Sequence, residues 1–217
     1  MPRTDLARKA RTHLRRVDPV IARVMEQVGP YRPGDRTGGS HFHALIRAIV
    51  FQQLSGKAAT TILNRFLALF SDNQPTPEAI LALTDEQLRA VGMSRQKSGY
   101  LRDLATKIQT GMLPLDHVDT RPDAELITHL IQVKGIGRWT AQMFLMFKLG
   151  RVDVLPELDL GIQNAIKRAY RKRRVLPKDV LRIGAKWSPY SSIACWYLWR
   201  SLDNGGGQAA TTKARQK

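Results

Sequence analysis

Hydrophobic residues recur with the period of an α-helix along most of this chain. The clearest stripe follows the i, i+3, i+4, i+7, i+8 spacing and consists of Phe42, Leu45, Ile46, Ile49 and Val50. The same spacing recurs over residues 62–70, and residues 5–16 form a polar, basic helix candidate. No segment alternates convincingly between apolar and polar residues, as a half-buried strand would. The pattern therefore predicts an all-α fold.

Capping residues and breakers divide this pattern into separate helices. Thr84 is a predicted N-cap, with Gln87 in the capping-box position and Gly92 as the stop. Three prolines are expected in the first turns of further helices, namely Pro122, Pro177 and Pro189. Residues 203–217, rich in glycine and basic residues, are expected to be a disordered tail.

The charge balance points to a polyanionic partner. Lys and Arg number 35 against 18 Asp and Glu, which gives a formal net charge of +17. Nucleic acid is the partner that such an excess favours, although a generically basic protein or one that binds acidic lipid has the same composition. The single cysteine, Cys195, excludes an internal disulfide framework and any cluster needing several thiolates from this chain.

No apolar run approaches the roughly 20 residues that cross a bilayer. The first residues also lack the apolar stretch of a secretory signal. We therefore expect a soluble intracellular protein, in the cytoplasm and nucleoid of a bacterium or the nucleus of a eukaryote, with no membrane partner.

A glycine-containing connection joins two predicted helices, over residues 123–131 and 139–147. Gly135 and Gly137 permit a tight turn whose backbone can approach another chain closely. The following helix presents N–H groups and a positive dipole end, which suit a phosphate. By itself a Gly-x-Gly turn favours a purely structural connection, because many helix pairs are joined in this way.

The segment Gly-Ile-Gly-Arg-Trp-Thr-Ala, residues 135–141, resembles the hairpin of the helix–hairpin–helix DNA glycosylase superfamily. Asp159 lies twenty positions after Trp139, within a Pro-Glu-Leu-Asp-Leu-Gly segment similar to that of the 3-methyladenine DNA glycosylase II branch. Residues 51–59 and 187–200 agree with the same branch, so the resemblance covers about residues 18–202 in the family's order. The chain looks like a compact form of this branch.

The resemblance implies a helical glycosylase domain over residues 1–202. Its two lobes would hold the hairpin and an active-site cleft between them, with the N- and C-terminal segments packing together. The implied activity is hydrolysis of the N-glycosidic bond of alkylated purines, such as 3-methyladenine, in double-stranded DNA. The nucleotide would be flipped out of the helix and an abasic site left behind. The protein would act as a monomer and need no cofactor.

Asp159 is the implied catalytic carboxylate. Its local sequence alone favours a helix N-cap, and in the family context both roles can hold. Trp139 and Trp199 resemble the aromatic walls of the base pocket. Met143 stands where some members have a tyrosine, and this departure affects the expected lesion preference. Trp139 also occupies the position of the lysine with which strand-cleaving relatives attack the sugar. Because an indole cannot form a Schiff base, we expect a hydrolase without lyase activity.

The implied DNA contacts fall in two turns. The hairpin contributes Lys134, Gly135, Gly137 and Arg138. The turn after the helix at 42–50 contributes a side chain that fills the gap left by the flipped base, and its candidates are Gln53, Leu54 and Ser55. The sequence does not choose among these three, although Leu54 has the greatest bulk. In relatives the hairpin also holds Na⁺ or K⁺ through main-chain carbonyls that match Ile131, Val133 and Ile136 here.

Two departures and two alternatives accompany the resemblance. Lys134 replaces the usual proline of the hairpin, and Leu158 replaces the first acid of the usual Asp-Asp pair.

One alternative is a non-catalytic protein that uses the hairpin only to bind DNA. The other is an adenine- or uracil-directed glycosylase, of which the iron–sulfur members are disfavoured by the lack of cysteines.

Overall fold

The computed structural model describes residues 3–32, 34 and 38–203, and within these residues the chain is helical with no β-strand. The predicted all-α fold is confirmed. The chain divides into two compact units, which we call the terminal unit (Met1–Asp35 and Arg151–Lys217) and the central unit (Arg36–Gly150). The predicted tail lies outside the described residues except for Asp203.

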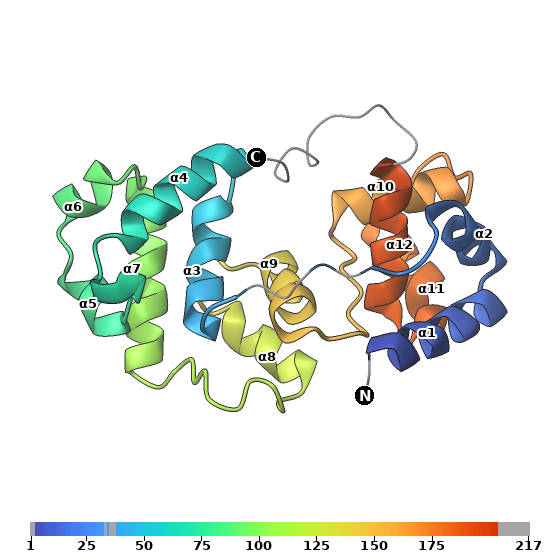
Figure 1. Ribbon diagram of the computed structural model, residues 1–217, viewed down its shortest axis with the longest axis horizontal. Coiled ribbons are helices and arrows are strands. Elements are labelled where there is room, and N and C mark those ends of the chain that lie inside the picture. The colour runs from blue at the N-terminus through green and yellow to red at the C-terminus, as the bar shows by residue number, and fades with distance from the viewer. Residues whose placement is uncertain (1–2, 33, 35–37, 204–217) are drawn as a thin grey trace. The chain divides into compact units, whose positions relative to one another are not determined.

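The central unit contains the helices that carry the hairpin (Figure 1). Its elements are α3 (His41–Phe51), α4 (Gly56–Leu67), η1 (Ser71–Asn73), α5 (Pro77–Ala82), α6 (Asp85–Ala90), α7 (Arg95–Gln109), α8 (Asp123–Leu130), α9 (Arg138–Met143) and η2 (Phe144–Leu149). The predicted apolar stripe of α3 is buried, with Leu45, Ile46, Ile49 and Val50 each fully inaccessible. Helix α3 packs on α4, α7 and η2, so its burial joins these elements into one core.

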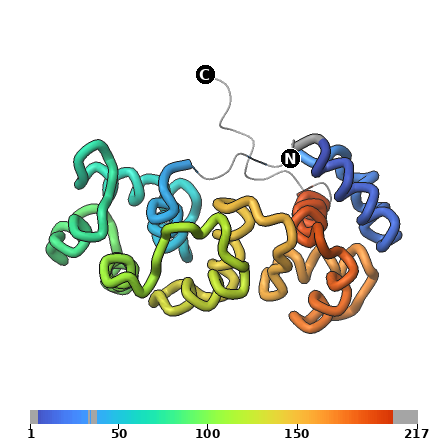
Figure 2. The backbone as a smooth tube through the Cα atoms, turned by 90° about the horizontal axis from the view of Figure 1, so that it is seen from below, coloured from blue at the N-terminus to red at the C-terminus, as the bar shows by residue number. Residues whose placement is uncertain are grey.

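The terminal unit combines the two ends of the chain. Its elements are α1 (Arg3–Val17), α2 (Pro19–Val28), α10 (Leu160–Ala169), α11 (Pro177–Gly184), η3 (Ala185–Trp187) and α12 (Ser191–Asp203). Helix α12 packs on both α2 and α10, and the blue N-terminal helices therefore lie beside the red C-terminal helix in Figures 1 and 2.

Asp18 joins these distant segments through one buried carboxylate. Its Oδ1 caps α2 by accepting from the Val20 N–H at 3.0 Å, and its Oδ2 accepts from Trp187 Nε1 at 2.8 Å. The Tyr170 hydroxyl also donates to Oδ2, and Lys186 Nζ lies 3.2 Å from it. Burial raises the pKa of Asp18, but the hydrogen bonds outweigh burial and hold the pKa below its usual value. A fully buried charge is thus compensated on both oxygens.

Several predicted helix boundaries are corrected by the structure. Thr84 and Gln87 do form a capping box, but Pro122 is an N-cap and not a first-turn residue. Pro189 follows a cis peptide bond and lies two residues before α12. Helix α12 begins at Ser191, whose N–H donates to the Asp153 carboxylate at 3.1 Å. The helix predicted over 139–147 begins one residue earlier and becomes a π-helix over Phe144–Leu149.

Candidate functional site

The connection between α8 and α9 is a tight hairpin with a buried base and an exposed tip. Val133 and Ile136 are buried, whereas Lys134, Gly137 and Arg138 are exposed. Gly135 has φ +83°, and a Cβ atom there would lie 2.2 Å from the Tyr100 ring of α7. Only glycine satisfies both the positive φ and the close ring, so the turn and its packing require this residue.

Two side chains from other elements hold the hairpin in place. Gln52, the C-cap of α3, donates from Nε2 to the Gly135 carbonyl at 2.7 Å. Asp103 of α7 accepts from the Lys134 N–H at 2.8 Å and from Lys107 Nζ at 2.7 Å. Burial raises the pKa of Asp103, but these hydrogen bonds outweigh burial and lower it. Sequence analysis missed both tethers, because neither residue is near the hairpin in the chain.

The start of α9 is suited to a close approach by an anion. Its N-cap is Gly137, so no side chain of the N-cap residue accepts a hydrogen bond from the first N–H groups of the helix. Helix α9 continues into η2, so its peptide dipoles align over both elements and leave partial positive charge at Gly137. The exposed Lys134 and Arg138 flank this end and add full positive charges. The four predicted DNA-contacting residues of the hairpin therefore share one exposed turn.

All three candidate residues in the turn after α3 are exposed. Gln53 has φ +55° and Leu54 is 38% exposed, whereas Ser55 Oγ caps α4 by accepting from the Ala58 N–H at 3.4 Å. Leu54 is thus an exposed apolar residue rather than part of the core. This is the arrangement that a side chain inserted into a base stack would need.

An apolar groove of about 630 Å³ lies between α3 and the α9–η2 segment. It is lined by Ala44, Arg47, Ala48, Phe51, Gln52, Gln53, Gly135, Trp139, Thr140, Met143, Phe144, Phe147 and Lys148. The predicted residues Trp139, which is 44% exposed, and Met143 both belong to it. Its volume lies within the range of small-molecule pockets. Arg47 was not predicted to line it, and Phe51 was noted only as the first residue of the segment 51–59 that resembles the family.

Asp159 and Trp199 meet in the terminal unit. Asp159 is the N-cap of α10, and its Oδ1 accepts from the Ile162 N–H at 2.8 Å and from Trp199 Nε1 at 3.0 Å. A Cβ at Gly161 would lie 3.0 Å from this oxygen and 3.1 Å from the Trp199 ring, so the glycine makes room for the pair. The carboxylate is 9% exposed.

The two leucines next to Asp159 in the chain expose apolar surface. Its chain neighbours Leu158 and Leu160 are 45% and 72% exposed, which is unusual for leucine. Burial and then the negative charge of Asp159 raise the pKa of the buried Cys195 thiol. Cys195 is therefore a buried, inert thiol. An anion held next to exposed apolar surface is a suitable group for stabilising a nearby positive charge.

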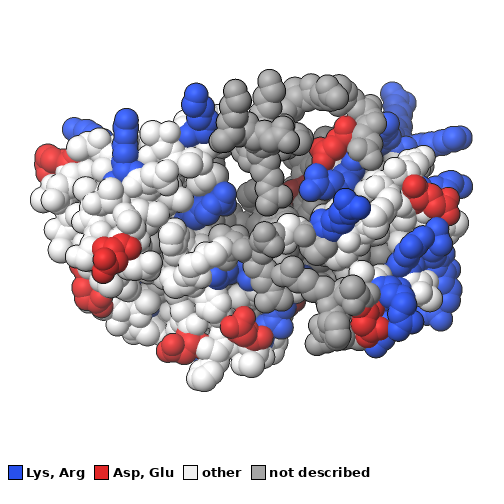
Figure 3. Space-filling view, viewed as in Figure 1, with Lys and Arg blue, Asp and Glu red and all other residues white. Residues whose placement is uncertain are grey.

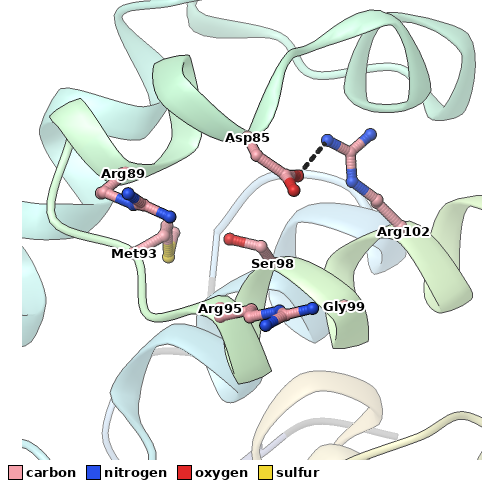
Figure 4. Close-up of a pocket in the computed structure, with 7 residues that line it drawn as sticks. All are labelled: Asp85, Arg89, Met93, Arg95, Ser98, Gly99 and Arg102. Carbon is pink, nitrogen blue, oxygen red and sulfur yellow. Dashed lines mark hydrogen bonds and ion pairs between the residues drawn. The ribbon is translucent and has the colours of Figure 1, made fainter.

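Basic side chains are more prominent than acidic ones on the face shown in Figure 3. A second cavity, of about 240 Å³, lies in the central unit and is lined by Arg89, Arg95 and Arg102 (Figure 4). Asp85 accepts from Arg102 at 2.9 Å in this cavity, so part of its positive charge is neutralised. No group of three metal-ligating side chains is found among the described residues, and no helix in that part of the chain is long and apolar enough to span a membrane.

Comparisons with known proteins agree with this geometry. The family model described as "HhH-GPD superfamily base excision DNA repair protein" matches residues 46–189. DNA-3-methyladenine glycosylase 1 of Schizosaccharomyces pombe is 38% identical, over 89% of this chain and 86% of its own. The structure of a 3-methyladenine DNA glycosylase from the same yeast, in complex with abasic DNA, superposes with a TM-score of 0.78 at 38% identity, over 88% of this chain and 95% of that one.

A third relative is bacterial. The DNA-3-methyladenine glycosidase of Bacillus halodurans superposes with a TM-score of 0.79 at 35% identity, over 89% of this chain and 88% of that one. The resemblance drawn from the hairpin and the Asp159 segment is confirmed. This chain belongs to the HhH-GPD superfamily of base excision DNA repair proteins.

Proposed function

We propose that this protein is a DNA glycosylase that hydrolyses the N-glycosidic bond of alkylated purines in double-stranded DNA. Its membership of the superfamily and the names of its relatives support this activity. The observation that carries the proposal is the Asp159 carboxylate, which two N–H donors hold beside exposed apolar surface. The protein would act on the genome, in a nucleoid or a nucleus, as a monomer.

Asp159 would act on the deoxyribose of a flipped nucleotide. As the bond between C1′ and the base nitrogen breaks, its electron pair leaves with the base and positive charge develops on the sugar. A carboxylate already held in place stabilises that charge without reorganising. Water then adds to C1′ and loses a proton, which yields an abasic site and the free base. Asp159 would orient this water as well as stabilise the cation.

The hairpin and the turn after α3 would bind the damaged duplex. Backbone N–H groups at Gly135 and Gly137, with Lys134 and Arg138, would contact phosphates of one strand. Leu54 would occupy the gap in the base stack, because it is the exposed apolar side chain of its turn. Trp139 and Met143 would contact the extruded base in the groove between α3 and α9.

The reaction would stop at the abasic site. A lyase needs an amine nucleophile, and the position of the lysine in strand-cleaving relatives is Trp139 here. The product strand should therefore be intact until alkali is added, and borohydride should trap no covalent complex.

The hairpin would also hold Na⁺ or K⁺ through the carbonyls of Ile131, Val133 and Ile136. These carbonyls follow the C-terminus of α8, where helix carbonyls lack intrahelical partners and carry partial negative charge. Such oxygen donors suit a hard monovalent cation. A bound ion would fix the turn, and replacing K⁺ by tetramethylammonium should then lower the affinity for undamaged DNA.

Base release from duplexes that each carry one defined lesion tests the function. Asp159→Asn should slow release by about 10²–10³-fold while DNA binding and the melting temperature persist. Asp179→Asn is the matched control, because Asp179 also caps a helix of the terminal unit, by accepting from the Leu176 N–H. A wild-type rate in Asp159→Asn would remove the assigned catalyst. DNA binding without release of any base would favour the non-catalytic alternative.

A further inference from the structure

The C-terminus of α3 is held by a lysine of another helix. Lys97 of α7 donates from Nζ to the carbonyl of Val50 at 2.7 Å and to the carbonyl of Gln52 at 2.8 Å. Carbonyls at the end of a helix lack intrahelical partners and carry partial negative charge, so a cationic donor suits them. Lys97 therefore fixes the backbone at the point where α3 ends.

This end of α3 leads directly into the turn proposed to enter the base stack, residues 52–55, which we call the wedge turn. Its first residue is Gln52, the C-cap of α3, and residues 53–55 are exposed. Gln52 is held twice, because its carbonyl accepts from Lys97 and its Nε2 donates to the Gly135 carbonyl at 2.7 Å. Lys97 thus acts on the residue that joins the wedge turn to the hairpin.

The same helix also supports the hairpin. Tyr100 lies three residues after Lys97, and Asp103 three residues after Tyr100, so their side chains follow one side of α7. The Tyr100 ring lies against Gly135. Asp103 accepts from the Lys134 N–H at 2.8 Å. Helix α7 therefore contacts both of the turns that we propose to bind DNA.

Arg102 provides a comparison within the same helix. It donates to the carbonyls of Leu83, at 2.7 Å, and Leu81, at 3.4 Å, where α5 ends, and it pairs with Asp85 (Figure 4). Lys97 holds two carbonyls in the same way, although burial lowers its pKa and no carboxylate of the described residues pairs with it. The two cations each hold a helix end, but only the end held by Lys97 leads to a turn proposed to contact DNA.

We propose that Lys97 is a positioning residue that fixes the wedge turn relative to the hairpin while a damaged nucleotide is extruded. This proposal rests on the proposed function, because it assumes that both turns bind the damaged duplex. An extruded nucleotide leaves a gap in the base stack, and an inserted side chain fills that gap only if its backbone stays in place. Since the hairpin would bind the phosphates, a fixed wedge turn keeps Leu54 at a constant position relative to the bound strand.

The test measures single-turnover release of 7-methylguanine from two duplexes, with the lesion paired with cytosine or opposite a gap. Lys97→Met should slow release about tenfold on the paired lesion, as expected for lost hydrogen bonds from a charged donor, and less on the unpaired lesion. Lys97→Arg keeps a cation with several donors and should restore most of the rate. Arg102→Met is the matched control, which also removes a cation from a helix end and should leave the ratio of the two rates unchanged.

A double-variant cycle with Leu54→Ala tests whether Lys97 acts through the wedge turn. The effects of two residues that act on one step are not additive. In the Leu54→Ala background, Lys97→Met should therefore change the ratio of paired to unpaired rates by less than about twofold. An effect as large as in the wild-type background would overturn the positioning role. If Lys97→Met does not fold, Lys97→Gln, which keeps a shorter and uncharged donor, replaces it in both comparisons and should shift the ratio in the same direction.

The outcomes separate the inference from the proposed function. A folded Lys97→Met variant with the wild-type ratio overturns the inference and leaves the function intact. Equal losses on the two duplexes, accompanied by a lower melting temperature, or the same change of ratio in Arg102→Met, would overturn it as well, because Lys97 would then only stabilise the fold. Wild-type protein that releases neither 7-methylguanine nor any other alkylated purine would overturn both proposals.

Discussion

The Trp199 indole donates from Nε1 to Oδ1 of Asp159 at 3.0 Å, and the same oxygen accepts from the Ile162 N–H at the start of α10. One carboxylate oxygen thus carries both a helix cap and the tether to α12. The cap and the proposed catalytic role are therefore compatible, since the cap holds the carboxylate in a fixed orientation. An N-cap and a catalyst were alternatives for Asp159 in the sequence, and the geometry allows both.

Trp199→Phe should slow base release without unfolding the protein. It keeps an aromatic ring but removes the N–H that orients Asp159, and a hydrogen bond to a charged group contributes about 1.5–3 kcal/mol. The expected loss in kcat is therefore about 10–100-fold, measured in single-turnover base release. Trp196→Phe is the matched control on the same helix and should stay within a factor of three of wild type. Equal rates for the two variants would contradict an orienting role for Trp199.

Gly135→Ala should distort the hairpin. The new Cβ would lie 2.2 Å from the Tyr100 ring at a residue with φ +83°, so both the turn and α7 must shift. Affinity for undamaged duplex DNA, measured by fluorescence anisotropy, should fall at least about tenfold, because the N–H groups that we propose to contact phosphates move together. Gly99→Ala, in open space on α7, should keep the affinity and stabilise the helix slightly.

Leu54→Ala should reduce activity on paired damage more than on unpaired damage. Leu54 would fill the gap in a base stack, and an unpaired base costs less to extrude. We expect about a tenfold loss on a fully paired lesion duplex and a smaller loss when the lesion lies opposite a gap. Leu69→Ala is the control, because Leu69 in the same unit is 39% exposed against 38% for Leu54. The wedge assignment fails if Leu54→Ala and Leu69→Ala have the same rates.

Asp18→Asn should destabilise the terminal unit in a pH-dependent way. Removing a buried, paired charge costs about 3–5 kcal/mol. The pKa of Asp18 is lowered in the folded protein. The Asp18 carboxylate therefore contributes its full stabilising free energy above the pKa of the unfolded state, near 3.9, and loses this contribution as the pH falls through the lower pKa of the folded state. The difference in unfolding free energy between wild type and variant should thus be constant from about pH 5 upward and shrink below about pH 4.

Urea unfolding at several pH values measures this difference. Asp203→Asn, at an exposed ion pair with Arg200, should change the unfolding free energy little at any pH. A difference for Asp18→Asn that persists unchanged at pH 2–3 would mean that the carboxylate charge is not what stabilises the network.

Much of the local structure could be predicted because its causes lie within four residues. The α3 stripe, the Thr84 capping box and the cap by Asp159 each depend on neighbouring side chains and N–H groups. The helix boundary at Pro189 was predicted wrongly because it depends on a side chain far away in the sequence. Helix α12 starts at Ser191 and not at Pro189, because the Ser191 N–H donates to the carboxylate of Asp153, 38 positions earlier in the chain.

The helices and the glycine-containing turn follow from periodicity and from local capping residues, which the amino-acid sequence records directly. The candidate carboxylate came from the resemblance to a known family, because its local sequence indicates only a helix cap. The tertiary structure alone decided that Gln52 and Asp103 hold the hairpin, that Trp199 orients Asp159 and that Arg47 stacks on Phe51 at the rim of a groove. Contacts such as the first three join residues 31 to 83 positions apart. Their formation depends on how whole helices pack, and no local pattern of hydrophobic and polar residues records that packing.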